Sequence, residues 1–184
     1  MSAASFFARW RVRLGYPLAI LVLFFARPSL RSILLAIPIG LVGLIIRAAA
    51  AGHLHKQEVL TMTGPYAYTR NPLYFGSALL TAGAAIGTWS WISGVILCVY
   101  FAVVYGVVMR REEGELRQHH GLAFEEYAQG VPLFFPRLTA APVGRMGQGT
   151  FSFVQYKKNR EYRAAIGFML LLSILVIIWW MRTR

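Results

Sequence analysis

The sequence predicts an all-α protein, a polytopic membrane helix bundle with about five transmembrane helices and a cytoplasmic N-terminus. Of its 184 residues, 57% are hydrophobic, and the mean hydropathy of +0.53 is well above what a soluble domain of this length needs to fill a core. The 19 Lys and Arg residues outnumber the 7 acidic residues, for a formal net charge of +12. Because the basic residues flank apolar runs, they indicate topology signals and contact with anionic membrane lipids, and they do not favour nucleic acid.

The first part of the chain contains two apolar runs. Residues 14–26 are short for a membrane crossing, so they predict either a tilted span or one arm of a hairpin with the next helix. Residues 33–51 form a longer run, in which Pro38 should kink the helix. Arg47 interrupts that run, so its guanidinium must either extend to the membrane surface or face a polar cavity.

Three more spans are predicted further along the chain. The stretch from Asn71 to Met109 has no charged residue and is long enough for two spans, with a turn between them at GTWS, residues 87–90. The clearest apolar run, residues 164–181, lies between Arg163 and Arg182 and ends with two tryptophans suited to a membrane interface.

The distribution of charge predicts the orientation of these spans. With a cytoplasmic N-terminus, fifteen of the 19 basic residues and all 7 glutamates fall in the inside regions. Such an excess follows the positive-inside rule for an inner, cytoplasmic membrane. We therefore expect any chemistry at the cytoplasmic face, in the loop before the third predicted span and in the segment after the fourth.

The first of these loops, GPYAYTRNPLYFG at residues 64–76, has the features of an anion site. Asn71 is a preferred helix N-cap, and Pro72 suits the first helical position. The helix start would present backbone N–H groups beside Arg70, where a carboxylate or phosphate fits. Tyr66 and Tyr74 offer flat faces for an aromatic ring or a cation. The alternative is an interfacial tyrosine belt with a capped helix and no ligand.

The second polar segment, residues 110–137, adds carboxylates. Glu112 and Glu113 follow the fourth predicted span directly, and they could form helical salt bridges with neighbouring arginines. Alternatively, the two carboxylates point to different faces, one pairing with an arginine and one binding a cationic or hydroxyl-bearing ligand. Residues 116–127 continue a helical pattern, and VPLFFP ends it. S-adenosylmethionine, which combines a carboxylate, an amine, a ribose and a flat base, would satisfy both loops.

The order of these motifs resembles the integral-membrane methyltransferases that include isoprenylcysteine carboxyl methyltransferase and the phospholipid N-methyltransferases. The resemblance covers roughly residues 33–137. Two positions depart from the family pattern, with His120 where Phe is usual and Phe124 where Tyr is usual. The positions that match are Arg70, Asn71, Pro72, Tyr74, Gly76, Glu112, Glu113, Leu116, Gly121, Tyr127, Val131 and Pro132.

The resemblance implies S-adenosylmethionine bound at the cytoplasmic surface, with a lipid-accessible tunnel that delivers a lipophilic acceptor such as a prenylcysteine-like carboxylate or an aminophospholipid. Glu113 or His120 would serve as a base for an amine acceptor, and an arginine such as Arg111 or Arg117 would position a carboxylate acceptor. The implied cofactor-binding residues are Tyr66, Arg70, Asn71, Pro72, Tyr74, Gly76, Glu112 and Glu113.

Several alternatives and boundaries complete the prediction. His53 and His55 are too few for a metal site without a third ligand, so we expect no metal. A membrane reductase that uses NADPH, or a non-enzymatic lipid-binding protein, are the alternatives to methyl transfer. The predicted divisions are an N-terminal basic segment and first helix (1–32), a methyltransferase core (33–137), a linker and interfacial segment (138–163) that includes GRMGQG, and a C-terminal membrane helix (164–184).

Overall fold

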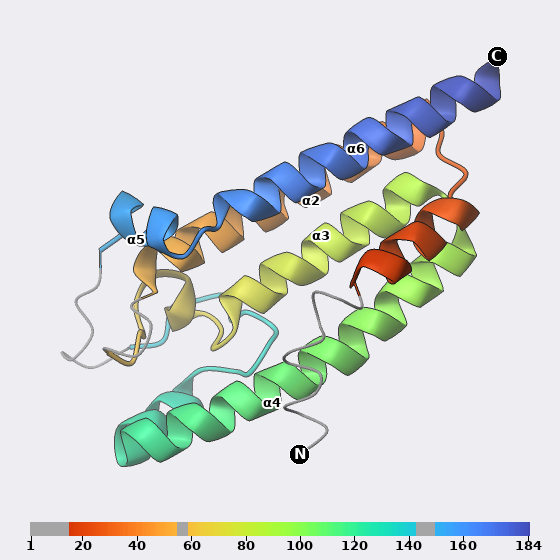
Figure 1. The fold of residues 1–184 in the computed structure, drawn as a ribbon. Helices are drawn as coiled ribbons and strands as arrows, with labels where there is room; N and C mark the ends of the chain where they lie inside the picture. Colours follow the sequence, from red (N-terminus) through yellow and green to blue (C-terminus); the bar gives the residue numbers. More distant parts are fainter. Residues whose placement is uncertain (1–14, 55–58, 143–149) are drawn as a thin grey trace. The chain divides into compact units, whose positions relative to one another are not determined.

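A computed structural model describes residues 15–54, 59–142 and 150–184, and within these ranges its regular secondary structure is helix, without strands (Figure 1). The all-α prediction is therefore confirmed for this part of the chain. GRMGQG, His55 and the N-terminal basic segment lie outside the described residues. The helices are Gly15–Phe25, α2 (Leu30–His53), the 3-10 helix η1 (Gly64–Ala67), α3 (Pro72–Thr88), α4 (Trp91–Gly130), α5 (Phe153–Lys158) and α6 (Tyr162–Thr183).

Helices occupy all five predicted spans, but they differ in length. Among the described helices, α2, α4 and α6 are long and apolar enough to cross a membrane. The helix Gly15–Phe25 is shorter, and α3 has 17 residues, at the low end of the roughly 17 to 25 that a crossing needs. The turn predicted at residues 87–90 falls between the end of α3 and the start of α4. The count of five spans and the orientation of the N-terminus stay predictions.

The chain divides into two compact units, which are described separately. The first, called here the bundle unit, comprises Met1–Val42, Ala78–Arg111 and Ile166–Arg184. Its core contains Ala26, Ile33 and Leu175, all less than 5% exposed. Glycines allow close helix contacts: a Cβ at Gly40 would lie 2.0 Å from the ring of Phe168. Such small residues are what membrane helices use to pack closely.

The second, called here the loop unit, comprises Gly43–Ser77 and Glu112–Ala165. Its core contains Leu60, Phe124, Tyr127, Val131 and Ala141. Backbone hydrogen bonds tie the segment after α4 to the loop before α3: the Arg70 N–H donates to Pro132 O at 2.9 Å, and the Arg137 N–H donates to Tyr68 O at 2.9 Å. The two segments that carry the sequence motifs therefore lie side by side.

The helical pattern predicted over residues 116–127 is interrupted at one point. Gly121 has φ 48° and ψ −123°, which breaks α4 there. Because glycine has no Cβ, it adopts this conformation at little cost. The break changes which side chains are covered: Leu116 is 37% exposed, whereas Phe124 and Tyr127 beyond the break are buried. The prediction of one continuous helix was wrong at Gly121.

Candidate functional site

The loop unit contains an ion pair between Arg70, just before α3, and Glu113 of α4. Arg70 Nη1 and Glu113 Oε1 lie 2.6 Å apart, and the two side chains are 15% and 20% exposed. Arg70 Nε and Glu113 Oε1 are buried, and among the described residues neither has a hydrogen bond, so Glu113 Oε1 has only its ionic contact with Arg70 Nη1. Buried polar groups are nearly always hydrogen-bonded. This pair therefore keeps one donor and one acceptor available for a ligand.

The neighbouring carboxylate, Glu112, has a different partner. The Tyr74 hydroxyl donates to Glu112 Oε1 at 2.6 Å. Successive residues of a helix point about 100° apart, so adjacent carboxylates reach different groups. The prediction that Glu112 and Glu113 face different ways, with one pairing with an arginine, is confirmed. Arg117, a possible partner in the helical salt-bridge alternative, pairs instead with Glu125 at 2.6 Å.

The start of α3 is organised by Asn71. The helix begins at Pro72, as predicted, and the Asn71 carbonyl accepts the N–H groups of Tyr74 at 3.1 Å and Phe75 at 3.0 Å. The Asn71 side-chain amide donates to Leu133 O at 3.0 Å, so it holds the segment after α4. Because Pro72 has no N–H and the N–H groups of Asn71 and Tyr74 are already bonded, the anion-binding capacity predicted for this helix end rests mainly on Arg70.

Two buried tyrosines form one wall of this cluster. The Tyr127 hydroxyl donates to Tyr66 O at 2.7 Å, and Tyr66 is 7% exposed. Burial raises the pKa of the Tyr66 hydroxyl well above its usual range, and Tyr127, Glu112 and Tyr74 raise it further. Tyr66 is therefore a neutral aromatic group beside the carboxylates at any physiological pH.

The remaining predicted site residues have other positions. Gly76 is a packing residue, because a Cβ there would lie 2.5 Å from Arg47 Cγ. His120 is half-buried directly before the break at Gly121, with its ring 6.3 Å from that of His119. Arg111 is exposed on α4 and belongs to the bundle unit. The structure brings together Arg70, Asn71, Tyr74, Glu112 and Glu113, with Tyr66 among them.

A second ion pair was not predicted from the sequence. Arg47 Nε contacts Glu161 Oε1, and Arg47 Nη1 contacts Ser77 Oγ and, at 3.2 Å, Leu73 O. The Arg47 and Glu161 side chains are 19% and 10% exposed. Arg47 therefore faces a polar environment, one of the two predicted possibilities. The available signal was the presence of a charged residue in an apolar run, which requires a partner.

The segment before α6 is fastened to the end of α2. The Asn159 side-chain amide donates to Ala51 O at 2.8 Å and to Leu54 O at 3.1 Å, and the Ser152 N–H donates to Gly52 O at 3.0 Å. These bonds occupy carbonyl groups that the last turn of a helix leaves without intrahelical partners. They also position Glu161 opposite Arg47.

Within its described residues, the chain has three helices able to cross a membrane and a half-buried cluster of arginine, glutamate and tyrosine where the loop before α3 meets the second half of α4. The model of the family described as phospholipid methyltransferase matches residues 44–123 of this chain. This match confirms the resemblance drawn from the motifs, and it supports a membrane methyltransferase.

Two similar proteins have names that refer to metal resistance. The nickel-cobalt-cadmium resistance protein NccN of Alcaligenes xylosoxydans xylosoxydans is 37% identical over 84 residues, which is 46% of this chain and 39% of that protein. The cobalt-zinc-cadmium resistance protein CzcN of Cupriavidus metallidurans is 37% identical over 84 residues, 46% of this chain and 38% of that protein. The chain thus matches about two-fifths of the length of these relatives. No solved structure matches it.

The names of these relatives make the metal-ligating residues relevant. Within the described ranges, no group of three or more His, Cys, Asp or Glu side chains is placed to hold an ion. His53 Nδ1 lies 2.8 Å from Ala49 O, one helical turn earlier in α2. That ring nitrogen is therefore engaged with the protein backbone.

Proposed function

We propose that this protein transfers a methyl group from S-adenosylmethionine to a lipophilic acceptor at the cytoplasmic surface of the inner membrane. The acceptor would be a prenylcysteine-like carboxylate or an aminophospholipid. The family match supports methyl transfer, and its range includes Arg70, Tyr74, Glu112 and Glu113 of the cluster. The observation that carries the cofactor assignment is the Arg70 and Glu113 pair, which retains a buried donor and a buried acceptor.

The residues of the cluster fit the cofactor by chemical type. Arg70 Nε can donate to the carboxylate of S-adenosylmethionine, and Glu113 Oε1 can accept from its amine or its ribose hydroxyls. Glu112 adds a second carboxylate, and Tyr66 and Tyr74 supply rings for the adenine or the positive sulfur. When bound, S-adenosylmethionine supplies a methyl group already activated by a sulfonium.

The chain's own contribution would be positioning and exclusion of water. The hydrogen bond from the Tyr74 hydroxyl to Glu112 holds both side chains in fixed orientations. The buried Tyr66 would help to keep water away from them. An amine acceptor must lose a proton, for which Glu113 or His120 is the candidate base. A carboxylate acceptor needs no base and would be positioned by Arg111.

The proposed arrangement in the membrane has five crossings and a cytoplasmic N-terminus. The positive-inside bias of the basic residues supports this orientation. All 7 glutamates of the chain fall within the sequence ranges of the loop unit. In this arrangement the loop unit would be the cytoplasmic part of the protein. Metal resistance, in the sense of the two relatives' names, is a candidate physiological setting, and anionic membrane lipids are the expected surroundings.

Binding of labelled S-adenosylmethionine to the purified protein in detergent tests the proposal. We expect saturable binding by the wild type and a loss of at least about tenfold in affinity for R70Q, since a charged hydrogen bond is removed. The matched control is R117Q, because Arg117 also pairs with a glutamate but is 58% exposed. Saturable NADPH binding without S-adenosylmethionine binding would instead support the reductase alternative. Equal binding by R70Q and R117Q would overturn the site assignment.

A further inference from the structure

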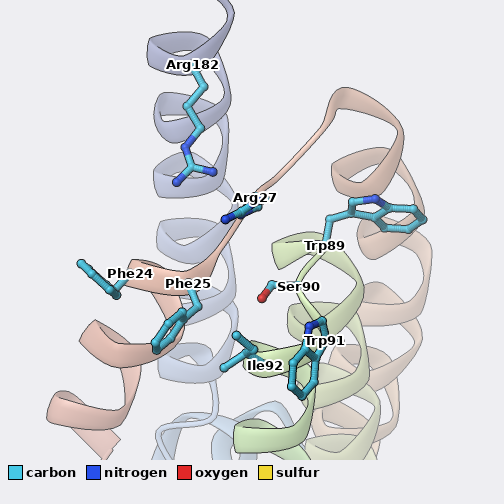
Figure 2. Close-up of a pocket in the computed structure, with 8 residues that line it drawn as sticks. All are labelled: Phe24, Phe25, Arg27, Trp89, Ser90, Trp91, Ile92 and Arg182. Atoms are coloured by element: carbon cyan, nitrogen blue, oxygen red, sulfur yellow. The ribbon is translucent and has the colours of Figure 1, made fainter.

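A cavity in the bundle unit has a composition that the proposed activity does not explain. It has a volume of about 460 Å³ and is lined by Phe24, Phe25, Arg27, Trp89, Ser90, Trp91, Ile92 and Arg182. The lining comes from the end of the helix Gly15–Phe25, the turn between α3 and α4, and the end of α6. In Figure 2 the Arg182 side chain extends toward Arg27, and Phe25 and Trp91 lie on either side of Ile92.

The walls of this cavity are held by buried hydrogen bonds. The Ser93 hydroxyl donates to Val22 O at 2.9 Å, and the Arg27 N–H donates to Thr88 O at 2.7 Å. Both Ser93 and Thr88 are fully buried. On the other side, Leu175 of α6 packs in the core with Ala26, directly before Arg27. The elements that carry the two cavity-lining arginines are therefore fastened to one another.

The cavity has positive charge without a compensating carboxylate. None of the 7 glutamates falls in the sequence ranges of the bundle unit, and the chain has no aspartate. Neither Arg27 nor Arg182 forms an ion pair or a side-chain hydrogen bond within the described part of the chain. Arg27 and Arg182 are both exposed residues that line one cavity, so an anion bound there would offset the repulsion between their like charges. A phosphate accepts bidentate hydrogen bonds from guanidinium groups.

The size and the aromatic lining indicate more than a free anion. A volume of about 460 Å³ is within the range of roughly 300 to 1,000 Å³ typical of small-molecule sites. Phe25, Ile92 and Trp91 provide an apolar surface beside the arginines. Tryptophan is also the residue that membrane proteins place at the level of the lipid headgroups. The ligand should therefore combine a phosphate with an apolar chain.

We propose that this cavity binds the phosphate headgroup of an anionic membrane lipid, with Arg27 and Arg182 as the phosphate ligands and the aromatic side chains against the glycerol and the upper acyl chain. The site is distinct from the cluster in the loop unit, and it does not depend on the proposed methyl transfer. On the topology proposed above, the two arginines belong to the four basic residues of the outer regions. The positive-inside rule predicts few basic residues in the outer regions, and lipid binding would explain why these two arginines lie there.

Native mass spectrometry of the detergent-purified protein tests the proposal, with phosphatidylglycerol, phosphatidylcholine of the same acyl chains, or inorganic phosphate added. We expect the wild type to retain phosphatidylglycerol at least about tenfold more than phosphatidylcholine, and R27Q/R182Q to lose this preference. The matched control is R31Q/R184Q, because Arg31 and Arg184 are exposed, as Arg27 and Arg182 are, and lie within four positions of them in the sequence but do not line the cavity. Equal losses in the two double variants would overturn the proposal.

Two further outcomes separate the lipid from a simple anion and from misfolding. Thermal stabilisation by inorganic phosphate equal to that by phosphatidylglycerol would overturn the assignment to a lipid. Phosphatidylglycerol with brominated chains should quench the fluorescence of the wild type, and the quenching should fall in W91F but not in W180F, since Trp180 lies outside the cavity. Unchanged quenching in W91F would contradict the placement of the acyl chain.

Discussion

The ion pair between Arg47 and Glu161 gives the sharpest test of how the loop unit is stabilised. The substitution E161Q keeps the size of the side chain and removes the negative charge beside Arg47. Removing one partner of a buried pair costs about 3 to 5 kcal/mol, because the other charge stays buried. Here the side chains are 19% and 10% exposed, and Arg47 keeps its contacts with Ser77 and Leu73 O. We therefore expect a loss of about 2 to 3 kcal/mol.

Thermal unfolding in detergent, followed by circular dichroism, measures this loss. For a chain of this size, 1 kcal/mol corresponds to a shift of about 2 to 4 °C, so Tm should fall by about 4 to 12 °C. The matched control is E125Q, which makes the same chemical change in the pair with Arg117, where the side chains are 58% and 43% exposed. An exposed pair is worth at most about 1 kcal/mol, so the control should change Tm little.

A double substitution separates a buried charge from a general loss of packing. In R47M/E161L both charges are removed and the apolar volume is largely kept, so stability should return close to that of the wild type. The reasoning is refuted if E161Q lowers Tm no more than E125Q. It is also refuted if R47M/E161L is less stable than E161Q, since the cost would then not come from an uncompensated charge.

Three further predictions concern packing and tyrosines in the loop unit. In G76A the new Cβ would meet Arg47 Cγ at 2.5 Å, so we expect a loss of about 1 to 3 kcal/mol by thermal unfolding, whereas G114A, which meets nothing within 4 Å, should lose no stability. In Y127F the carbonyl of Tyr66 loses its hydrogen-bond donor, so the free energy of unfolding should fall by about 1 to 3 kcal/mol. An unchanged free energy of unfolding would contradict this prediction. Because the pKa of Tyr66 is raised from 10.0 on folding, the native state holds its proton more tightly, so stability is fully present below pH 10 and falls as the pH rises above it. A pH series of unfolding should show a smaller alkaline loss in Y66F than in the wild type.

The helices and the different orientations of the two adjacent glutamates could be predicted from the sequence, whereas their partners Tyr74 and Arg70 were not predicted. Long apolar runs and the Asn71-Pro72 start are local signals, and they placed α2, α3 and α6 within a few residues. The opposite orientations of Glu112 and Glu113 follow from helix geometry alone. The break at Gly121 could not be predicted, because an isolated glycine inside a helical pattern is compatible with either a continuous or a broken helix.

The pairing of Arg47 with Glu161 could not be predicted for a different reason. An apolar run that contains an arginine requires a partner, but several glutamates were equally possible, and no periodicity connects residues 114 positions apart. The partner is selected by the fold: Ser152 and Asn159 bond to the end of α2 and thereby bring Glu161 to Arg47. Local patterns do not encode such a contact.

The position of Glu161 changes how the segment before α6 should be interpreted. The family match covers residues 44–123, so Arg47 lies inside the matched region and Glu161 lies outside it. An arginine within an apolar helical run requires a partner, and the described structure supplies that partner from the unmatched segment. The same arginine contacts Ser77 and Leu73 O in α3, the helix whose first turn carries Tyr74. The segment around Glu161 is therefore a structural part of the loop unit, because it neutralises the charge against which the start of α3 is packed.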